Sequence, residues 1–249
     1  MLDWKGSYVT VGGHTFRAQY EAEGELIPDS VPVFKTQSMI QTVHDVIEKV
    51  QPQRILELGI FQGGSTALIA SLAPDARVVA VDIEEHPPQT LQRFIAKTGD
   101  DGRIKAHYGV DQADRDAIRR IIATEFGDDP IDFVIDDASH ELQRSRASLD
   151  VILPFVRPGG CYFLEDWAWG HLMHSPFGQT QPAGAWPNGG PLTPLVFEMV
   201  MAAGSNTEVF TEVELNFTGA RGWRGNADLD PETFSLHQAI YDPDRFLTM

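Results

Sequence analysis

The apolar positions of this chain follow two alternating spacings along its length. Short aliphatic runs at 54–58, 78–81 and 132–136 are bounded by polar or glycine-containing segments, as strands buried on both faces are. Between these runs, over 36–50 and 115–126, apolar residues recur at helical intervals. Strands that alternate with helices in this way predict an α/β fold with a doubly wound, mostly parallel sheet.

The two ends of the chain depart from this alternation. Residues 8–11 and 14–17 flank Gly12-Gly13 and predict a β-hairpin with a two-residue turn. Near the other end, 208–217 alternates as a strand, 219–230 reads as a loop and 234–241 as a last strand, which suggests an antiparallel closing pair. We therefore predict an N-terminal hairpin and loop over 1–35 and a main domain over 36–249.

A long aperiodic segment interrupts the main domain at 167–194. It is rich in Gly, Pro, Gln and Trp, and loops of this length inside a compact domain are usually functional. Its alternative is a disordered surface insertion, but Trp167, Trp169 and Trp186 argue against that, because disordered segments are poor in aromatic residues. We interpret the segment as a lid over the substrate.

Acidic residues follow two successive predicted strands. The first strand ends at Asp136 and Asp137, with His140 three residues on, and the next ends at Glu165 and Asp166. Ligands of open α/β sheets bind outside the carboxyl ends of the strands, and neighbouring strands lie about 4.8 Å apart. Three carboxylates converging there would need a cation, and hard oxygen ligands suit Mg²⁺, Mn²⁺ or Ca²⁺.

The acids also have a less specific interpretation. Strands of α/β proteins often end in Asp because Asp suits turns and helix N-caps. Two successive strands that each end in paired acids favour a metal or catalytic site over capping. The sequence thus predicts a cation held by Asp137, Glu165 and Asp166, with His140 as a candidate base.

A glycine turn follows the strand at 54–58. Gly59 and Gly63 would let the backbone approach a ligand, and a helix that starts near Ser65 would present free N–H groups to it. A tight strand-to-helix turn explains these glycines equally well. Asp82 adds weight, because an acid at the end of the second strand is where Rossmann-like units bind a ribose.

Composition narrows the choice of partners and compartment. The 19 Lys and Arg residues against 36 Asp and Glu give a formal net charge of −17, which disfavours nucleic acid and anionic membranes as partners. Cys161 is the single cysteine, so no disulfide forms within the chain and we expect a reducing, cytoplasmic location. We see no signal peptide and no apolar run long enough to span a membrane.

Taken together, these motifs resemble class I S-adenosylmethionine (SAM)-dependent methyltransferases. The segments 57–59 and 63–65 with Asp82 are similar to the cofactor motifs of that superfamily. The more specific likeness, over 136–140 and 159–166, is to the Mg²⁺-dependent O-methyltransferases of macrolide sugars and the related cephalosporin hydroxylase-type group. The resemblance covers roughly residues 33–170 and implies a Rossmann-like, mostly parallel seven-stranded sheet with an antiparallel closing strand.

The resemblance also implies an activity and its residues. We expect methyl transfer from SAM to a hydroxyl of a small molecule, a sugar or natural-product glycoside, with Mg²⁺ or Mn²⁺ as the metal; a homo-oligomer is left open. His140 would be the general base, and Asp137, Glu165 and Asp166 the metal ligands. The expected cofactor-binding residues are Glu57, Gly59, Gly63, Ser65, Asp82, Asp111, Gln112 and Asp136.

Three other functions compete with this one. A SAM-binding protein without chemistry would have no use for the acidic site. A nicotinamide oxidoreductase is disfavoured because the glycine spacing is not that of a dinucleotide fingerprint. A cephalosporin hydroxylase-like tailoring enzyme remains as the third alternative, since some members of the related group carry that label.

Overall fold

Seven strands form the main sheet of the computed structural model, which describes residues 1–168 and 191–241. Their order across the sheet is β10-β11-β9-β8-β5-β6-β7. The strands are β5 (Arg54–Leu58), β6 (Arg77–Val81), β7 (Ile104–His107), β8 (Ile131–Asp136), β9 (Val156–Glu165), β10 (Phe210–Asn216) and β11 (Gly219–Arg224). Most of the predicted lid, residues 169–190, lies outside the described residues.

The strand directions confirm the predicted fold class. β5 pairs in parallel with β6, and β6 with β7, whereas β11 runs antiparallel to both β9 and β10. Every residue of β8 is buried, including Asp132 and Asp136, as in a strand covered on both faces. The chain therefore has a Rossmann-like, mostly parallel seven-stranded sheet with an antiparallel closing strand.

The chain divides into two compact units. The first comprises Met1–Asp111 with Ile131–Val134, and the second comprises Gln112–Pro130 with Ile135–Met249. Strand β8 contributes residues to both. The boundary that the sequence suggests after residue 35 stays a prediction.

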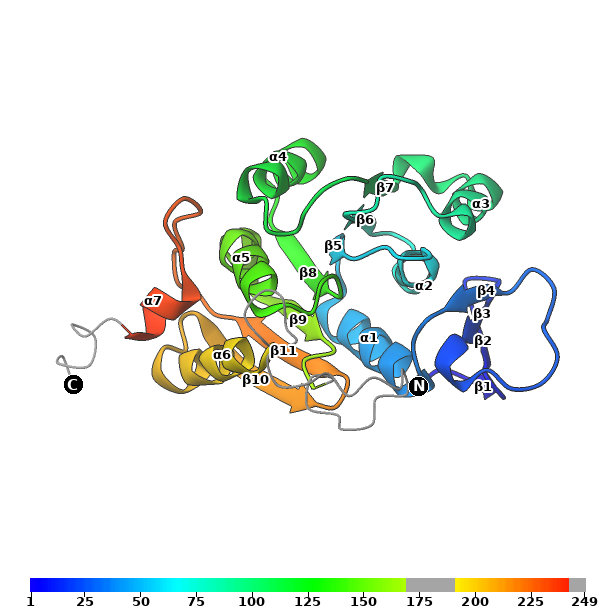
Figure 1. Cartoon of the computed structure of the whole chain (residues 1–249), viewed down its shortest axis with the longest axis horizontal. Coiled ribbons are helices and arrows are strands. Elements are labelled where there is room, and N and C mark those ends of the chain that lie inside the picture. The colour runs from blue at the N-terminus through cyan, green and yellow to red at the C-terminus, as the bar shows by residue number, and fades with distance from the viewer. Residues whose placement is uncertain (169–190, 242–249) are drawn as a thin grey trace. The chain divides into compact units, whose positions relative to one another are not determined.

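The first unit carries a second sheet, β1-β2-β3-β4, beside β5, β6 and β7 (Figure 1). β2 and β3 form the predicted hairpin, in which Val11 faces His14 across the turn. The elements added here are β1 (Trp4–Lys5), β2 (Tyr8–Val11), β3 (His14–Ala18), β4 (Val31–Val33), α1 (Gln37–Val50), α2 (Gly64–Leu72), α3 (Gln89–Thr98) and the short 3-10 turns Gln19–Glu21 and Asp100–Gly102.

Helix α1 shows how closely local sequence sets an element. Thr36 caps its start, because the Thr36 hydroxyl accepts a hydrogen bond from the Met39 backbone N–H at 3.2 Å. The apolar positions that predicted the helix are its buried face: Met39, Ile40, Val43, Val46, Ile47 and Val50. Gln51 ends it in the left-handed conformation, directly before Pro52.

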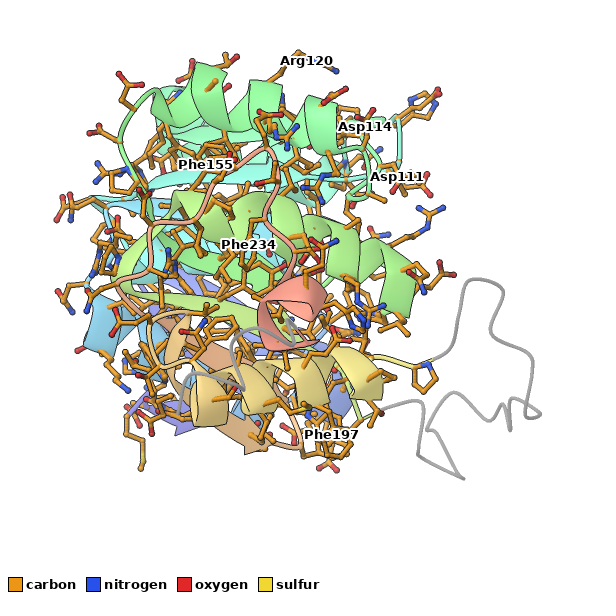
Figure 2. The ribbon with its side chains drawn as sticks, turned by 90° about the vertical axis from the view of Figure 1, so that its left-hand side faces the viewer. Asp111, Asp114, Arg120, Phe155, Phe197 and Phe234 are labelled. Atoms are coloured by element: carbon orange, nitrogen blue, oxygen red, sulfur yellow. The ribbon has the colours of Figure 1, made fainter. Side chains whose placement is uncertain are left out.

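The second unit places four helices around β9, β11 and β10 (Figure 1). They are α4 (Arg115–Phe126), α5 (Leu142–Ile152), α6 (Thr193–Ser205) and α7 (Leu236–Tyr241), with a 3-10 turn at Leu153–Phe155. Helix α6 packs against β10 and α7, and α5 packs against α4. Figure 2 shows Phe197 on α6, where it is exposed, and Phe234 ahead of α7, where it is buried.

Two predictions about the end of the chain are wrong. Residues 219–224, expected in a loop, form β11, and 236–241, expected in a strand, form α7. The glycines that suggested a loop are there because β11 lies between two strands: a Cβ at Gly222 would come within 2.5 Å of the Phe210 ring. Helix α7 is fixed at its start by Asp150, which accepts the Leu236 N–H at 2.8 Å.

Helix α5 ends at Ile152, and Pro158-Gly159-Gly160 lies inside β9, which begins at Val156. None of the helices within the described ranges is long and apolar enough to cross a membrane.

Candidate functional site

The glycine turn after β5 has a backbone that only glycine accommodates at two places. Gly59 has φ 93° and donates to the Val81 carbonyl at 2.8 Å, and Gly63 has φ 80° and donates to the Ile60 carbonyl at 2.7 Å. At Gly64 the constraint is space, since a Cβ there would lie 1.9 Å from the Pro32 carbonyl oxygen. The turn therefore delivers the start of α2 close against the backbone of β4.

Asp82, directly after β6, holds this turn in place. Its Oδ2 accepts the backbone N–H groups of Ile60 at 2.7 Å and Phe61 at 2.8 Å, and its Oδ1 accepts that of Glu84 at 2.9 Å. These bonds explain how Phe61, with φ 48°, is held in the left-handed region. The predicted ribose contact of Asp82 stays a prediction; the structure adds a second task for the same carboxylate.

Glu57 fixes the other side of the turn. Its buried carboxylate accepts the Thr66 hydroxyl at 2.6 Å, which ties the first turn of α2 to β5. Ser65, at the start of α2, is partly exposed. The nearby Tyr108 has its pKa raised, first by burial and then by the negative charge of Asp82.

Asp111 lies in the loop between β7 and α4, where it is partly exposed (Figure 2). Asp114, labelled in the same view, caps α4 by accepting the Ala117 N–H at 2.9 Å. Asp114 is therefore a helix N-cap, which is a common structural role of Asp in proteins.

In the second unit an acid–histidine group forms beyond the ends of β8 and β9. Asp137, His140 and Asp166 each offer one ligand atom, and these atoms lie within 4.8 Å of one another. His140 Nε2 lies 3.8 Å from Asp137 Oδ1, and the two side chains are 24% and 22% exposed. The group is therefore accessible to a ligand but sheltered from bulk water.

Backbone geometry brings these side chains together. His140 has φ 54° and Asp166 has φ 53°, a region that non-glycine residues occupy rarely and often at functional sites. Asp166 donates its N–H to the Thr218 carbonyl at 3.3 Å, and the Trp167 indole N–H donates to the Asn216 carbonyl at 2.9 Å. The turn between β10 and β11 thus supports the end of β9.

Glu165 has a different position from the one expected of a third ligand. It is 1% exposed at the end of β9 and faces Gly219 of β11 in the strand register. Among the described residues, the group that could hold a metal contains His140 where the sequence predicts Glu165. Two carboxylate oxygens and an imidazole nitrogen suit a divalent cation such as Mn²⁺ or Mg²⁺.

Asp136 is buried beside this group and carries a hydrogen-bond network of its own. It accepts Gln112 Nε2 at 3.1 Å, the Ser148 hydroxyl at 2.9 Å and the Tyr162 hydroxyl at 2.9 Å. Burial raises the pKa of the Asp136 carboxyl, against the lowering effect of its donors. Burial and the charge of Asp136 raise the pKa of Tyr162 well above its usual value.

The sequence identified Asp136 and Gln112 but not the role of Ser148 and Tyr162. No local signal marks them, because they come from α5 and β9, far along the chain from Gln112. Only the fold brings the four side chains to one point.

Comparison with known proteins finds a likeness to methyltransferases over slightly less than half of the chain. Residues 56–167 match the family described as "Methyltransferase domain". This region contains the glycine turn, Asp82 and the acid–histidine group, and it confirms the resemblance to SAM-dependent methyltransferases.

Two curated relatives are named as O-methyltransferases. The chain is 37% identical over 124 residues to 8-demethyl-8-(2-methoxy-alpha-L-rhamnosyl)-tetracenomycin-C 3'-O-methyltransferase of Streptomyces olivaceus, covering 47% of this chain and 28% of that one. It is 34% identical over 123 residues to mycinamicin VI 2''-O-methyltransferase of Micromonospora griseorubida, covering 47% and 27%. The chain thus spans less than a third of the length of these relatives.

The solved structures extend the likeness beyond the matched region. MycE methyltransferase from the mycinamycin biosynthetic pathway, in complex with Mg, SAH and mycinamycin VI, superposes with a TM-score of 0.55 at 25% identity. The alignment covers 76% of this chain and 49% of that chain. Over 76% of its own length, the chain is therefore similar in fold to a methyltransferase whose structure was solved with Mg and SAH.

Proposed function

We propose that this chain is a metal-dependent O-methyltransferase domain that transfers the methyl group of SAM to a hydroxyl of a small molecule, a sugar or a natural-product glycoside. The observation that carries the proposal is the group of Asp137, His140 and Asp166 within a region that matches a methyltransferase family. A protein that only binds SAM would have no need of two carboxylates and a histidine grouped in this way, with His140 and Asp166 held in the left-handed region.

The cofactor would bind at the glycine turn of the first unit. Gly59 and Gly63 place no side chain on the turn, and Ser65 is the second residue of α2, whose first N–H groups have no acceptor within the helix. Asp82 would accept the ribose hydroxyls in addition to the backbone bonds it already makes. Glu57 would act indirectly by fixing α2, and Asp111 is the candidate for the adenosine end.

Asp137 and Asp166, with Glu165 as the sequence predicts, would hold the divalent cation. Bound there, Mg²⁺ or Mn²⁺ would stabilise negative charge on a neighbouring oxygen, as Lewis acids do. The donor set fits a hard cation because two of its three members, Asp137 and Asp166, are carboxylates.

His140 would supply the base. In the tautomer whose Nε2 carries no proton, the imidazole would accept the proton of an acceptor hydroxyl through that atom. The reaction then balances: the hydroxyl oxygen forms a bond to the methyl carbon, the carbon–sulfur bond of SAM breaks, and the proton goes to His140. The methyl group of a sulfonium is already activated, so positioning supplies much of the rate.

The acceptor class rests on the named relatives. Both curated methyltransferases carry sugar-position names, 3'-O and 2''-O, which suggests a glycoside hydroxyl here as well. Two neighbouring hydroxyls could both reach a metal held by Asp137 and Asp166, which would favour a diol.

The proposal is tested by mixing the chain with SAM, Mg²⁺ and a panel of rhamnosides and other deoxysugar glycosides, and measuring S-adenosylhomocysteine. Acceptor-dependent formation of S-adenosylhomocysteine supports transfer. A non-catalytic SAM-binding protein would show a rise in melting temperature with SAM and no product, a nicotinamide enzyme a rise with NAD instead, and a cephalosporin hydroxylase-like enzyme a hydroxylated rather than a methylated product.

A further inference from the structure

We infer that Asp136, Gln112, Ser148 and Tyr162 form a positioning network that holds the turn carrying Asp137 and His140, and that none of the four contacts substrate. This inference rests on the proposed function for its catalytic consequence. Its structural part stands on the contacts of the second unit alone.

Gln112 is the link between the network and the turn. Its Nε2 donates to Asp136 Oδ1 at 3.1 Å and to the Ser148 hydroxyl at 3.0 Å, while its Oε1 accepts the Ser139 backbone N–H at 2.9 Å. A glutamine amide has one donor end and one acceptor end, and the three bonds use both in a single orientation. Asp136 therefore dictates which end of Gln112 faces Ser139.

Ser139 lies between Asp137 and His140 in the chain, so the bond from its N–H fixes the middle of the turn. Ser139 Oγ also accepts the Glu141 N–H at 3.2 Å, which ties the turn to the start of α5. A turn with a left-handed His140 persists only where its surroundings impose it. The amide of Gln112 is the buried contact that does so here.

Asp136 is anchored from the other side. Ser148 on α5 and Tyr162 on β9 donate to its Oδ2 at 2.9 Å each, and both are fully buried. Asp136 is 1% exposed and Gln112 is 5% exposed. Three donors bind the buried carboxylate of Asp136. Under this inference Asp136 and Gln112 act by positioning the turn, in place of the cofactor contact that the sequence predicts for them.

Buried polar networks are sensitive to the loss of one member, because the remaining groups are left without partners. Gln112→Met keeps the shape of the side chain but removes both ends of the link. Ser148→Ala removes one donor to Asp136. Ser145→Ala is the matched control: Ser145 is also buried on α5, one turn earlier, and its Oγ has no hydrogen-bond partner among the described residues.

The experiment measures amide hydrogen exchange by mass spectrometry together with SAM binding and turnover. Gln112→Met should raise exchange in the peptide spanning 137–141 by about tenfold, lower kcat by about tenfold or more and leave SAM affinity within about twofold. Ser148→Ala should move both quantities in the same direction, and Ser145→Ala should move neither. If Gln112→Met fails to fold, Tyr162→Phe, which removes one hydroxyl, should show the same local effect at smaller size.

Unchanged exchange at 137–141 would overturn the inference. A rise in exchange spread evenly over the whole chain would also overturn it, because that result would mean that the network stabilises the fold in general and does not position this turn. The exchange measurement needs no substrate. An increase at 137–141 in a protein without methyl transfer would therefore reject the proposed function and keep the positioning network.

Discussion

The carboxylate of Asp82 accepts the backbone N–H of Phe61 at 2.8 Å, across the turn that joins β5 to α2. The same oxygen accepts the N–H of Ile60. A single acid thus sets the shape of the turn at which we propose that the cofactor binds.

Replacing Asp82 should weaken the turn and the cofactor site together. We expect Asp82→Ala to lower the melting temperature and to reduce SAM affinity by at least about tenfold, because hydrogen bonds to a charged group contribute about 1.5–3 kcal/mol. Asp82→Asn keeps one acceptor oxygen and should lose less of both. Titration calorimetry and thermal unfolding measure the two effects, and wild-type values for Asp82→Ala in both would remove Asp82 from the site and the turn.

Gly64→Ala should destabilise the fold. The added Cβ would lie 1.9 Å from the Pro32 carbonyl oxygen, so the backbone of α2 or β4 must shift. Overpacking of this kind typically costs about 1–3 kcal/mol. Gly102→Ala is the control, because nothing lies within 4 Å of a Cβ there. Urea unfolding measures the stability of the two variants. Equal midpoints would contradict the prediction and show that the backbone around Gly64 shifts at little cost in free energy.

Part of the candidate site can be predicted from the sequence alone. The glycine turn, Asp82, Asp137 and His140 are all visible as motifs, because each sits at the end of a strong apolar run. The orientation of Glu165 into the buried side of β9 and the contacts of Ser148 and Tyr162 with Asp136 depend on residues distant in the chain. β11 could not be predicted for a related reason. Its glycines are required by the two strands on either side of it, but in the local sequence glycines indicate a loop.

Asp150 should give a pH-dependent contribution to stability. Burial raises the pKa of its carboxyl above the ordinary 3.8, although the Leu236 N–H favours the charged form. The folded chain then binds the proton more tightly than the unfolded chain. The stabilisation is present below the ordinary value and is lost as pH rises through the raised pKa.

Asp150→Asn has no proton to lose at this position. The difference in unfolding free energy between Asp150→Asn and the wild type should therefore shift in favour of the variant as pH rises from about 3.8. Urea unfolding over a series of pH values measures it. A difference that stays constant with pH would show that burial does not govern this carboxyl.

His140→Ala separates the base from the metal ligands. As a lost general base it should reduce kcat by about 10²–10⁴-fold, with SAM affinity nearly unchanged. If His140 is instead a ligand, as its place in the group allows, the concentration of Mg²⁺ for half-maximal rate should rise and excess Mg²⁺ should restore part of the rate. Wild-type kcat in this variant would leave His140 as a structural residue of the turn.

The most direct test of the account is methyl transfer with and without a chelator. We expect S-adenosylhomocysteine formation by the wild-type chain to stop in EDTA and to return when Mg²⁺ is added in excess. Asp137→Ala should bind the cation more weakly, so that it needs more Mg²⁺ for the same rate. Full activity in EDTA, or an Asp137→Ala variant with the wild-type Mg²⁺ requirement, would contradict the metal site at Asp137 and Asp166.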